Sequence, residues 1–251
     1  MTQPRSFPGR GHVYDVLVVG AGISGCEAAF ACAEASLDVL LVTTSLDTVY
    51  NLAGAGAKLT PSPRTLMHTL CQEVADETDF VRPWELHRAA KYALEHRPGI
   101  HLLQSSVSTL IVEKDGVEDG EVKGVTTWEG VPRFAKRTAL CVGSFLEARL
   151  TVGSLTEKAG RLSEMAYDDL YKDLQSLEFS FEDVEIDAPS SGGSLAYSVA
   201  CKVFAQGERS GFQLTSFKNL YAAGLCAKGY LSYEDAALQG RNLADALIAS
   251  L

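Results

Sequence analysis

The sequence of 251 residues is 46% hydrophobic and 22% charged, with 22 glycines and 8 prolines. This composition excludes a disordered or fibrous protein and predicts one large globular domain, or one domain with a small lobe. The chain has 22 Lys and Arg against 32 Asp and Glu, a formal net charge of −10. This charge disfavours binding to naked nucleic acid through neutralisation of its phosphates, and we expect no such binding by this chain alone.

The cysteines and histidines are scattered along the chain, and no CxxC pair is present. Several cysteines lie in apolar runs, so we expect reduced, mostly buried thiols in a cytoplasmic protein. Residues 1–11 lack the apolar stretch of a leader, and no run approaches the ~18 apolar residues of a membrane span. The five histidines are not spaced as ligands with cysteines or carboxylates, so we expect no metal site.

The N-terminal region has the pattern of a βαβ unit. Residues 14–20 form an apolar run that ends in glycine, which is typical of a strand buried on both faces of a parallel sheet. Residues 24–35 are rich in alanine and predict a helix that packs closely on the sheet. Residues 37–42 predict the second strand, and the total of about 30 residues suits a parallel crossover.

The following region predicts two helices and then an antiparallel meander. Apolar residues recur at helical spacing over 63–76 and 83–96, and each range opens near a proline. From Ile100 the period changes to two, which predicts strands. These are expected over 100–104, 107–113, 121–128, 131–136 and 138–142, with turns at Asp115-Gly116, Asp119-Gly120 and Glu129-Gly130.

Residues 151–190 differ in composition from the rest of the chain. We expect a helix over 163–177, a very acidic stretch over 178–187 and a flexible return over 190–194. The first pattern then returns, with a short strand over 219–224 and an alanine- and leucine-rich helix over 233–249. Residues 151–190 are therefore interpreted as a small inserted lobe.

The glycine loop supplies the strongest chemical signal. Gly20-Ala-Gly-Ile-Ser-Gly25 matches GxGxxG between the first strand and the first helix. Gly20 allows the tight turn, Gly22 lets a diphosphate approach the backbone, and Gly25 lets helix and strand pack closely. The helix N-terminus can then bind the diphosphate without a basic side chain. The alternative is a glycine-rich turn with no ligand.

The remaining layout favours FAD over a nicotinamide cofactor. The second strand ends in Thr43-Thr44, where an acidic residue commonly binds the adenosine ribose, and hydroxyls can replace it. A classical nicotinamide fold would continue with alternating strands and helices, whereas this chain turns to a meander. We predict an α/β fold: a Rossmann-like FAD-binding domain with a central parallel sheet and a β-meander over 12–150 and 191–251, and the inserted lobe over 151–190.

Several segments along the chain carry a family resemblance. They are Gly22-Ile-Ser-Gly-Cys-Glu-Ala-Ala29, Leu41-Val-Thr-Thr-Ser-Leu-Asp-Thr48, Thr109–Glu113 through Gly124-Val, Cys141-Val-Gly-Ser-Phe-Leu146, and Ala223-Gly224 followed by Tyr233-Glu-Asp-Ala-Ala-Leu-Gln-Gly240. These segments resemble the FAD-binding part of the glucose-inhibited division protein A family, flavoenzymes that modify the tRNA wobble uridine, and of its folate-dependent tRNA methyltransferase relatives. The resemblance covers most of 14–153 and 219–248.

The resemblance implies a set of FAD-binding residues spread along the chain. Gly20, Ala21, Gly22, Ile23 and Ser24 would line the diphosphate, Thr43 and Thr44 the ribose, Val107 the adenine, Gly143 and Ser144 the diphosphate side, and Gly224 and Leu225 the ribityl chain. The helix that opens near Glu234 would point its N-terminus at the flavin. Glu234 and Asp235 are equally explained as ordinary first-turn acids.

Three departures from the family pattern limit what the resemblance implies. The position of the family's reactive cysteine corresponds to about Gly54. A basic family segment in the insertion is replaced near 181–189 by acidic residues. We also expect the C-terminal helical region that engages tRNA and a partner GTPase to be absent.

The sequence leaves three functions open. The first is a flavin-dependent oxidoreductase, with Cys226 as a redox group or, alternatively, a packed thiol, and with NADH or NADPH as a transiently bound donor. The second is a tRNA-modification component that acts with a protein partner. The third is a flavin-binding subunit without catalysis. No catalytic residue is assigned.

Overall fold

Five parallel strands form the centre of the molecule. The computed structural model describes residues 7–113, 120–166, 168–188 and 195–251. The parallel strands run in the order β17-β8-β1-β2-β5. Their bounds are β1 Val13–Val19, β2 Val39–Thr43, β5 Ile100–Gln104, β8 Pro132–Leu140 and β17 Leu220–Ala222. Helix α1 (Ile23–Glu34) connects β1 to β2, which confirms the predicted βαβ unit.

The strand β1 is buried on both faces, as its apolar run predicts. Val16 and Val18 pack in the core between the sheet and the helices. Leu17 and Val19 pack in a second core, on the side of the meander. The alternation follows from the period of two in a strand, and it explains why no polar residue interrupts the second half of β1.

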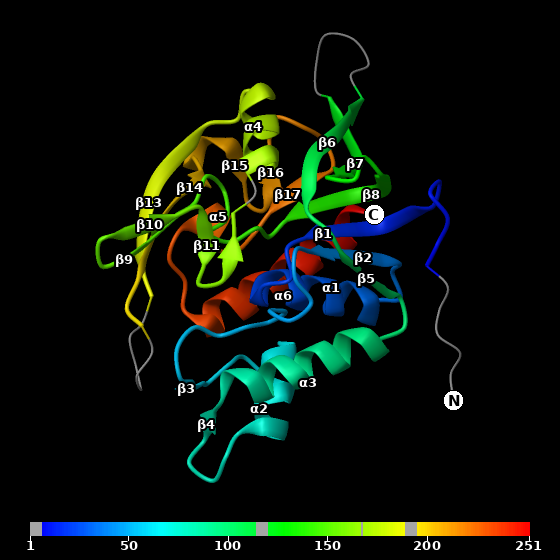
Figure 1. Ribbon diagram of the computed structural model, residues 1–251. Coiled ribbons are helices and arrows are strands. Elements are labelled where there is room, and N and C mark those ends of the chain that lie inside the picture. Colours follow the sequence, from blue (N-terminus) through cyan, green and yellow to red (C-terminus); the bar gives the residue numbers. More distant parts are fainter. Residues whose placement is uncertain (1–6, 114–119, 167, 189–194) are drawn as a thin grey trace.

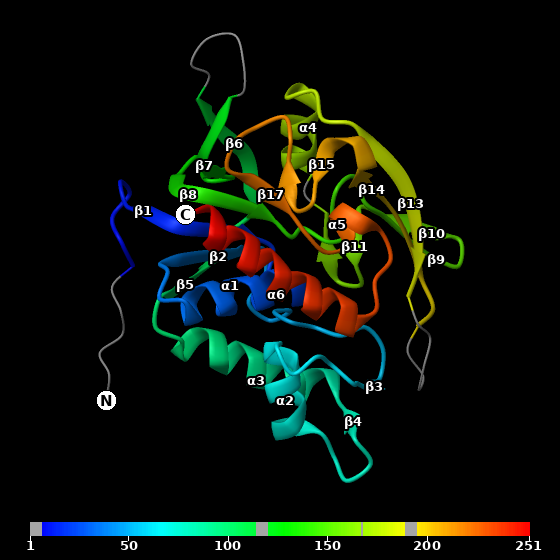
Figure 2. The same cartoon turned by 180° about the vertical axis from the view of Figure 1, so that it is seen from behind.

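Helices cover one face of the sheet in two layers (Figure 1). Helix α1 packs along α6 (Tyr233–Ser250), and the view from behind shows the same pair crossing under the strands (Figure 2). Helices α2 (Leu66–Val74) and α3 (Pro83–His96) form the outer layer. The Thr65 hydroxyl accepts from the His68 N–H at 3.3 Å and begins α2, and Pro83 stands in the first turn of α3.

The meander consists of β6 (Val107–Glu113), β7 (Glu121–Thr127) and the first half of β8. The Gly130 N–H donates to the Thr127 carbonyl at 2.8 Å, so the predicted turn at 129–130 is confirmed. The turn predicted at Asp115-Gly116, and Asp119 of the next one, lie outside the described residues.

Strand β8 is one strand where the sequence predicted two. Its first residues pair with β7, and from Phe134 onward it pairs with β1. The polar pair Lys136-Arg137 stands where the two predicted strands would have met, and both side chains are satisfied: the Lys136 Nζ lies 2.7 Å from Asp15, and the Arg137 Nε donates to the Ser250 hydroxyl at 2.9 Å. Partners distant in sequence therefore allow the strand to continue.

A second sheet belongs to the inserted region. Its four strands run in the order β10-β9-β14-β13. Their bounds are β9 Arg149–Val152, β10 Leu155–Glu157, β13 Phe181–Asp187 and β14 Ser198–Phe204. Strand β14 joins this sheet although the sequence analysis assigned it to the FAD-binding domain, and the return predicted over 190–194 lies outside the described residues. Residues 149–204 are called the lobe below.

The helix predicted over 163–177 is shorter than expected. Residues 159–165 form a hairpin of β11 (Ala159–Arg161) and β12 (Glu164–Met165), and Ser163 adopts a φ of +63° in its turn. Helix α4 spans Asp168–Ser176 and packs on β6 through Leu170 and Leu174. Residues 163–165, predicted as helix, instead belong to this hairpin, because β11 and β12 pair with each other.

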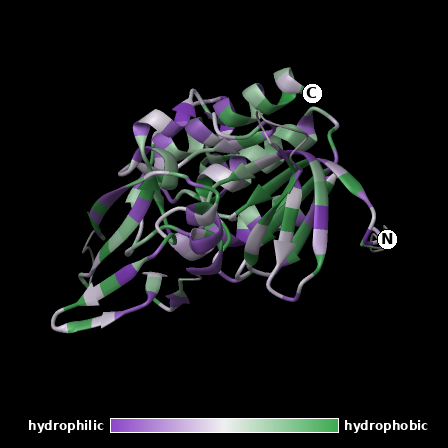
Figure 3. Cartoon of the chain, turned by 90° about the horizontal axis from the view of Figure 1, so that it is seen from above, coloured by the Kyte–Doolittle hydropathy of each residue, from purple (hydrophilic) through white to green (hydrophobic). Residues whose placement is uncertain are grey.

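Short elements complete the fold. They are β3 (Ala57–Lys58), β4 (Phe80–Val81), β15 (Arg209–Ser210), β16 (Gln213–Leu214), the 3₁₀ turn Gln206–Glu208 and α5 (Leu225–Lys228). The hydrophobic colour gathers on the central strands (Figure 3), in agreement with the two cores that enclose them. Within the described part of the chain, no helix is long and apolar enough to cross a membrane.

Candidate functional site

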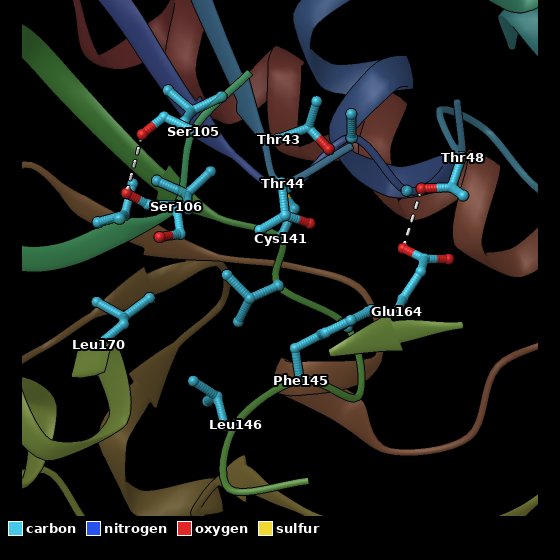
Figure 4. Close-up of a pocket in the computed structure, with 18 of the residues that line it drawn as sticks. Thr43, Thr44, Thr48, Ser105, Ser106, Cys141, Phe145, Leu146, Glu164 and Leu170 are labelled. Carbon is cyan, nitrogen blue, oxygen red and sulfur yellow. Dashed lines mark hydrogen bonds between the residues drawn. The ribbon is translucent and has the colours of Figure 1, made fainter. Parts of the chain in front are cut away.

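A pocket opens at the carboxyl end of the parallel strands. The glycine loop after β1, the ends of β2 and β8, and the residues that lead into β6 form one wall, and the hairpin β11–β12 faces them. Figure 4 shows Ser105 and Ser106 at one end of this first pocket, and Thr48 and Glu164 at the other. Ligands of open α/β sheets bind at this edge.

The glycine loop has the geometry that the motif predicts. Gly20 has a φ of +103°, and a Cβ there would lie 2.3 Å from the Cys141 carbonyl oxygen. A Cβ on Gly25 would lie 1.9 Å from the Gly20 carbonyl oxygen. Gly22, in contrast, faces open space with no heavy atom within 4 Å of a Cβ. The loop thus leaves a cradle at Gly22, at the N-terminus of α1, that fits a diphosphate.

Hydroxyl groups line the middle and one end of the first pocket. The Thr43 hydroxyl donates to the Ser45 carbonyl at 3.2 Å, and Thr44 lies beside it on the pocket wall. The Ser105 hydroxyl is within hydrogen-bonding distance of Glu129 at 2.7 Å, and its backbone N–H donates to the Thr43 carbonyl. These contacts hold the ends of β2 and β5 together, next to Val107. The arrangement can bind a ribose and a base without a charged residue on this wall.

The structure brings most of the expected site residues to this edge of the sheet. The first pocket is lined by Gly20, Ala21, Gly22, Thr43, Thr44, Val107 and Gly143. A second pocket is lined by Ser144, Leu225 and Glu234. Ile23, Ser24 and Gly224 line neither pocket. The Ser24 hydroxyl donates to the Ala236 carbonyl at 2.8 Å, and a Cβ on Gly224 would lie 2.9 Å from that hydroxyl, so these two residues join α1 to α6.

The second pocket lies between the lobe and the start of α6. Tyr197, Tyr230 and Tyr233 contribute aromatic rings to its wall. The Tyr233 hydroxyl donates to the Ala53 carbonyl at 3.2 Å and accepts from the Ala53 N–H at 2.9 Å. Segment 53–59 is therefore fixed against α6. Arg161 lines both pockets, which places it where they adjoin.

Sequence reasoning missed the residues that the lobe and the loops contribute. The Arg161 guanidinium lies 3.2 Å from Glu164, and Glu164 accepts a hydrogen bond from the Thr48 hydroxyl at 3.0 Å. Phe145 and Leu170 add apolar surface. Thr48 and Phe145 lie in segments that carry the family resemblance, but Arg161, Glu164 and Leu170 do not. The pairing of β11 with β12, across a turn that looked helical, places Arg161 and Glu164 at the site.

Glu27 supports the glycine loop from behind. Its side chain is only 1% exposed and accepts hydrogen bonds from the Tyr50 hydroxyl at 2.5 Å and from the backbone N–H groups of Leu66 and Met67 at 2.8 and 2.7 Å. Burial raises the pKa of this carboxyl, against the lowering effect of the three donors. Glu27 thus joins α1 to the N-terminus of α2 and to segment 49–52.

Cys226 is a packed thiol. It is completely buried, its Sγ lies 3.4 Å from the Ala223 carbonyl oxygen, and burial raises its pKa to about 11. All six cysteines are buried and unpaired. The described residues contain no group of three or more His, Cys, Asp and Glu side chains that could hold a metal ion.

The fold and the site define the class of protein. A parallel sheet with the glycine loop at its carboxyl edge, a meander that follows the second crossover, and a pocket that extends toward the C-terminal helix are typical of Rossmann-like FAD-binding proteins. The chain belongs to the glucose inhibited division protein A family, whose family model matches residues 15–189.

Relatives support this membership. A solved structure of a GidA-related protein from Thermus thermophilus is 37% identical, with a TM-score of 0.84 over 96% of this chain and 100% of that one. The tRNA uridine 5-carboxymethylaminomethyl modification enzyme MnmG of Chlamydia caviae is 29% identical over 74% of this chain and 34% of its own length. Aquifex aeolicus GidA, 14% identical with a TM-score of 0.79 over 95% of this chain and 66% of its own, shares the fold.

The comparisons confirm the family, the fold class and the cofactor expected from the sequence. Members of this family bind FAD, and this chain is an FAD-binding flavoprotein. The chain spans about a third of the length of the curated relatives it matches. The activity of those longer proteins is therefore attributed to this chain only as a proposal.

Proposed function

We propose that this protein is an FAD-dependent oxidoreductase. The observation that carries the proposal is the pair of adjoining pockets along the sheet edge, which share Arg161. The first pocket suits the adenosine and diphosphate half of FAD, since it joins hydroxyl groups and apolar residues such as Val107 to the Gly22 cradle. The second suits the flavin ring, and its tyrosines can flank a substrate.

Each element of the site would have a distinct task. The N-terminus of α1 would bind the diphosphate, and the N-terminus of α6 would lie toward the flavin. The Ser232 hydroxyl accepts from the Asp235 N–H at 3.0 Å, and Glu234 accepts from the Thr60 N–H at 3.2 Å. Glu234 is thus engaged in holding segment 57–60. The dipole of α6, rather than the Glu234 side chain, would therefore provide the proposed interaction with the flavin. FAD itself would supply the redox chemistry.

The cradle at Gly22 offers a direct test of cofactor binding. We expect the Gly22→Val variant to fold like the wild type, because its φ of −70° suits any residue and a Cβ there has no heavy atom within 4 Å. The same side chain would occupy the space of the diphosphate. The purified variant should therefore lack the flavin absorbance that the wild type shows, at an unchanged circular dichroism spectrum.

The matched control is Gly9→Val, because Gly9 is exposed and also has open space around a Cβ. It should retain FAD like the wild type. A Gly22→Val protein that retains stoichiometric FAD would contradict the proposed binding mode. A colourless wild type that does not take up added FAD would contradict the proposed function as a whole.

Turnover distinguishes an oxidoreductase from a flavin-binding subunit without catalysis. We expect anaerobic NADH or NADPH to bleach the flavin absorbance within the time of a manual assay, with the donor binding transiently. Reduction by dithionite alone would favour the non-catalytic subunit. The six buried, unpaired thiols suit a reducing compartment, and we propose the cytoplasm.

We further propose that the reaction concerns tRNA and that a protein partner supplies the RNA contact. The name of the MnmG relatives suggests the substrate. The net charge of −10 argues against direct binding of tRNA by this chain. A gel shift at low salt should show no complex with tRNA for the chain alone. A tight complex there would remove the need for a partner.

A further inference from the structure

The hairpin β11–β12 brings the only charged side chains among the described residues that line the first pocket. These are Arg161 and Glu164, whose side chains are 26% and 10% exposed. All other residues that line this pocket are apolar, small or hydroxyl-bearing. Arg161 is also the one described residue that the first and second pockets share. No residue of the glycine loop lines both pockets as Arg161 does.

The hairpin is held at the site by several contacts. Arg161 and Glu164 are register partners, and Glu164 is bonded to Thr48 on the loop after β2. The Ser144 hydroxyl donates to the Gly160 carbonyl at 2.7 Å, and a Cβ on Gly160 would lie 2.5 Å from the Phe145 ring. The hairpin backbone thus packs directly on the loop after β8, so Arg161 projects from a fixed support.

The charge balance of the cofactor site favours a contribution from Arg161. The diphosphate of FAD is a dianion, and the sheet side of the pocket offers it backbone N–H groups and a helix dipole but no cation. Glu164 alone would repel it. A guanidinium can bind phosphate oxygens through two parallel hydrogen bonds while it keeps its contact with a carboxylate, because it has five donors.

We propose that Arg161 binds the diphosphate of FAD from the lobe, opposite the glycine loop, and so ties the lobe to the occupied site. This inference rests on the proposed FAD-dependent function. It adds a binding residue that the glycine-loop motif does not contain, and it explains why the lobe hairpin lies where the adenosine end and the flavin end of the cofactor would meet.

The test measures nucleotide affinity with the apoprotein. FAD binding is followed by flavin fluorescence, and ADP and AMP are titrated as competitors, since they differ in the second phosphate. We expect Arg161→Gln to weaken FAD and ADP binding by at least about tenfold and AMP binding much less, so that the ratio of ADP to AMP affinity falls. Arg161→Lys, which keeps the charge and loses the fork, should lie between.

The matched control is Lys158→Gln, which removes a positive charge from the start of the same hairpin, outside both pockets. Lys158 is exposed and pairs with Asp168 at 3.1 Å. It should leave the affinities and their ratio unchanged. Equal weakening of ADP and AMP by Arg161→Gln, or no weakening, would overturn the inference. A wild type that binds no FAD would instead overturn the proposed function.

Discussion

The two walls of the first pocket are built in different ways. The sheet wall, made of Gly20–Gly22, Thr43–Thr44, Val107 and Gly143, presents backbone, small side chains and hydroxyls. The lobe wall, made of Arg161, Glu164 and Leu170, presents long side chains with charge. The sheet wall is fixed by close backbone contacts, whereas the lobe wall is fixed by side-chain contacts. Substitutions at the close backbone contacts behind the first wall should therefore damage the fold, whereas substitutions on the second wall should tune binding.

A pair of glycines tests this difference most strongly. A Cβ on Gly25 would meet the Gly20 carbonyl oxygen at 1.9 Å, and this backbone atom cannot rotate away. A Cβ on Gly160 would meet the half-buried Phe145 ring at 2.5 Å, and a ring can rotate away. We expect Gly25→Ala to cost roughly 3 kcal/mol or more in free energy of unfolding, and Gly160→Ala about 1 kcal/mol or less.

Chemical denaturation of the two apoproteins measures both values. Gly160→Ala should also weaken FAD binding several-fold, because the Phe145 ring that rotates away lines the first pocket. Gly22→Ala is the control on the sheet wall, since its side chain meets open space and should leave the unfolding free energy nearly unchanged. Equal costs for Gly25→Ala and Gly160→Ala would remove the proposed difference between the walls.

The second largest effect is expected at Glu27, behind the sheet wall. Glu27→Leu leaves the Tyr50 hydroxyl and the N–H groups of Leu66 and Met67 without their acceptor. We expect a loss of roughly 3 kcal/mol in unfolding free energy, because each buried unpaired donor is costly. Glu27→Gln keeps one acceptor oxygen and should lose less. A loss below that of Tyr50→Phe would show that the carboxylate has no such role.

The same residue predicts a pH dependence. Because burial raises the pKa of Glu27 above its ordinary value of 4.5, the native state binds the proton more tightly than the unfolded state does. Its contribution is fully present below pH 4.5 and is lost as the pH rises through the raised pKa. The cost of Glu27→Gln should therefore shrink with rising pH in this window. Denaturation at a series of pH values would refute this if the cost grew.

The sheet wall could be predicted from the sequence because its signals are local. The spacing of Gly20, Gly22 and Gly25 and the run of β1 each lie within a few residues, and the same is true of Thr43-Thr44 at the end of β2. The contacts that these residues require follow from backbone geometry alone. The sequence therefore predicts both the βαβ unit and the cradle at Gly22.

The lobe wall could not be predicted, because its contacts join distant residues. Thr48 forms a hydrogen bond with Glu164, which lies 116 residues further along the chain. Arg161 reaches the site only through a short hairpin whose residues look like the start of a helix. Strand β8 shows the same limit, since Asp15 and Ser250 satisfy its polar pair. Short strands in the lobe gain their stability from partners elsewhere in the chain, which a local pattern does not contain.

The smallest effect is expected at Cys226, which lines neither pocket. Its complete burial and its pKa of about 11 leave almost no thiolate at neutral pH, and the thiolate is the reactive form. Iodoacetamide at neutral pH should therefore leave Cys226 unlabelled in the native protein, with or without FAD, and label it once the protein is unfolded in guanidinium. Peptide mapping by mass spectrometry distinguishes it from the other five thiols. Rapid labelling of Cys226 in the native protein would contradict this prediction and support Cys226 as a redox group. The site would then combine flavin chemistry with thiol chemistry.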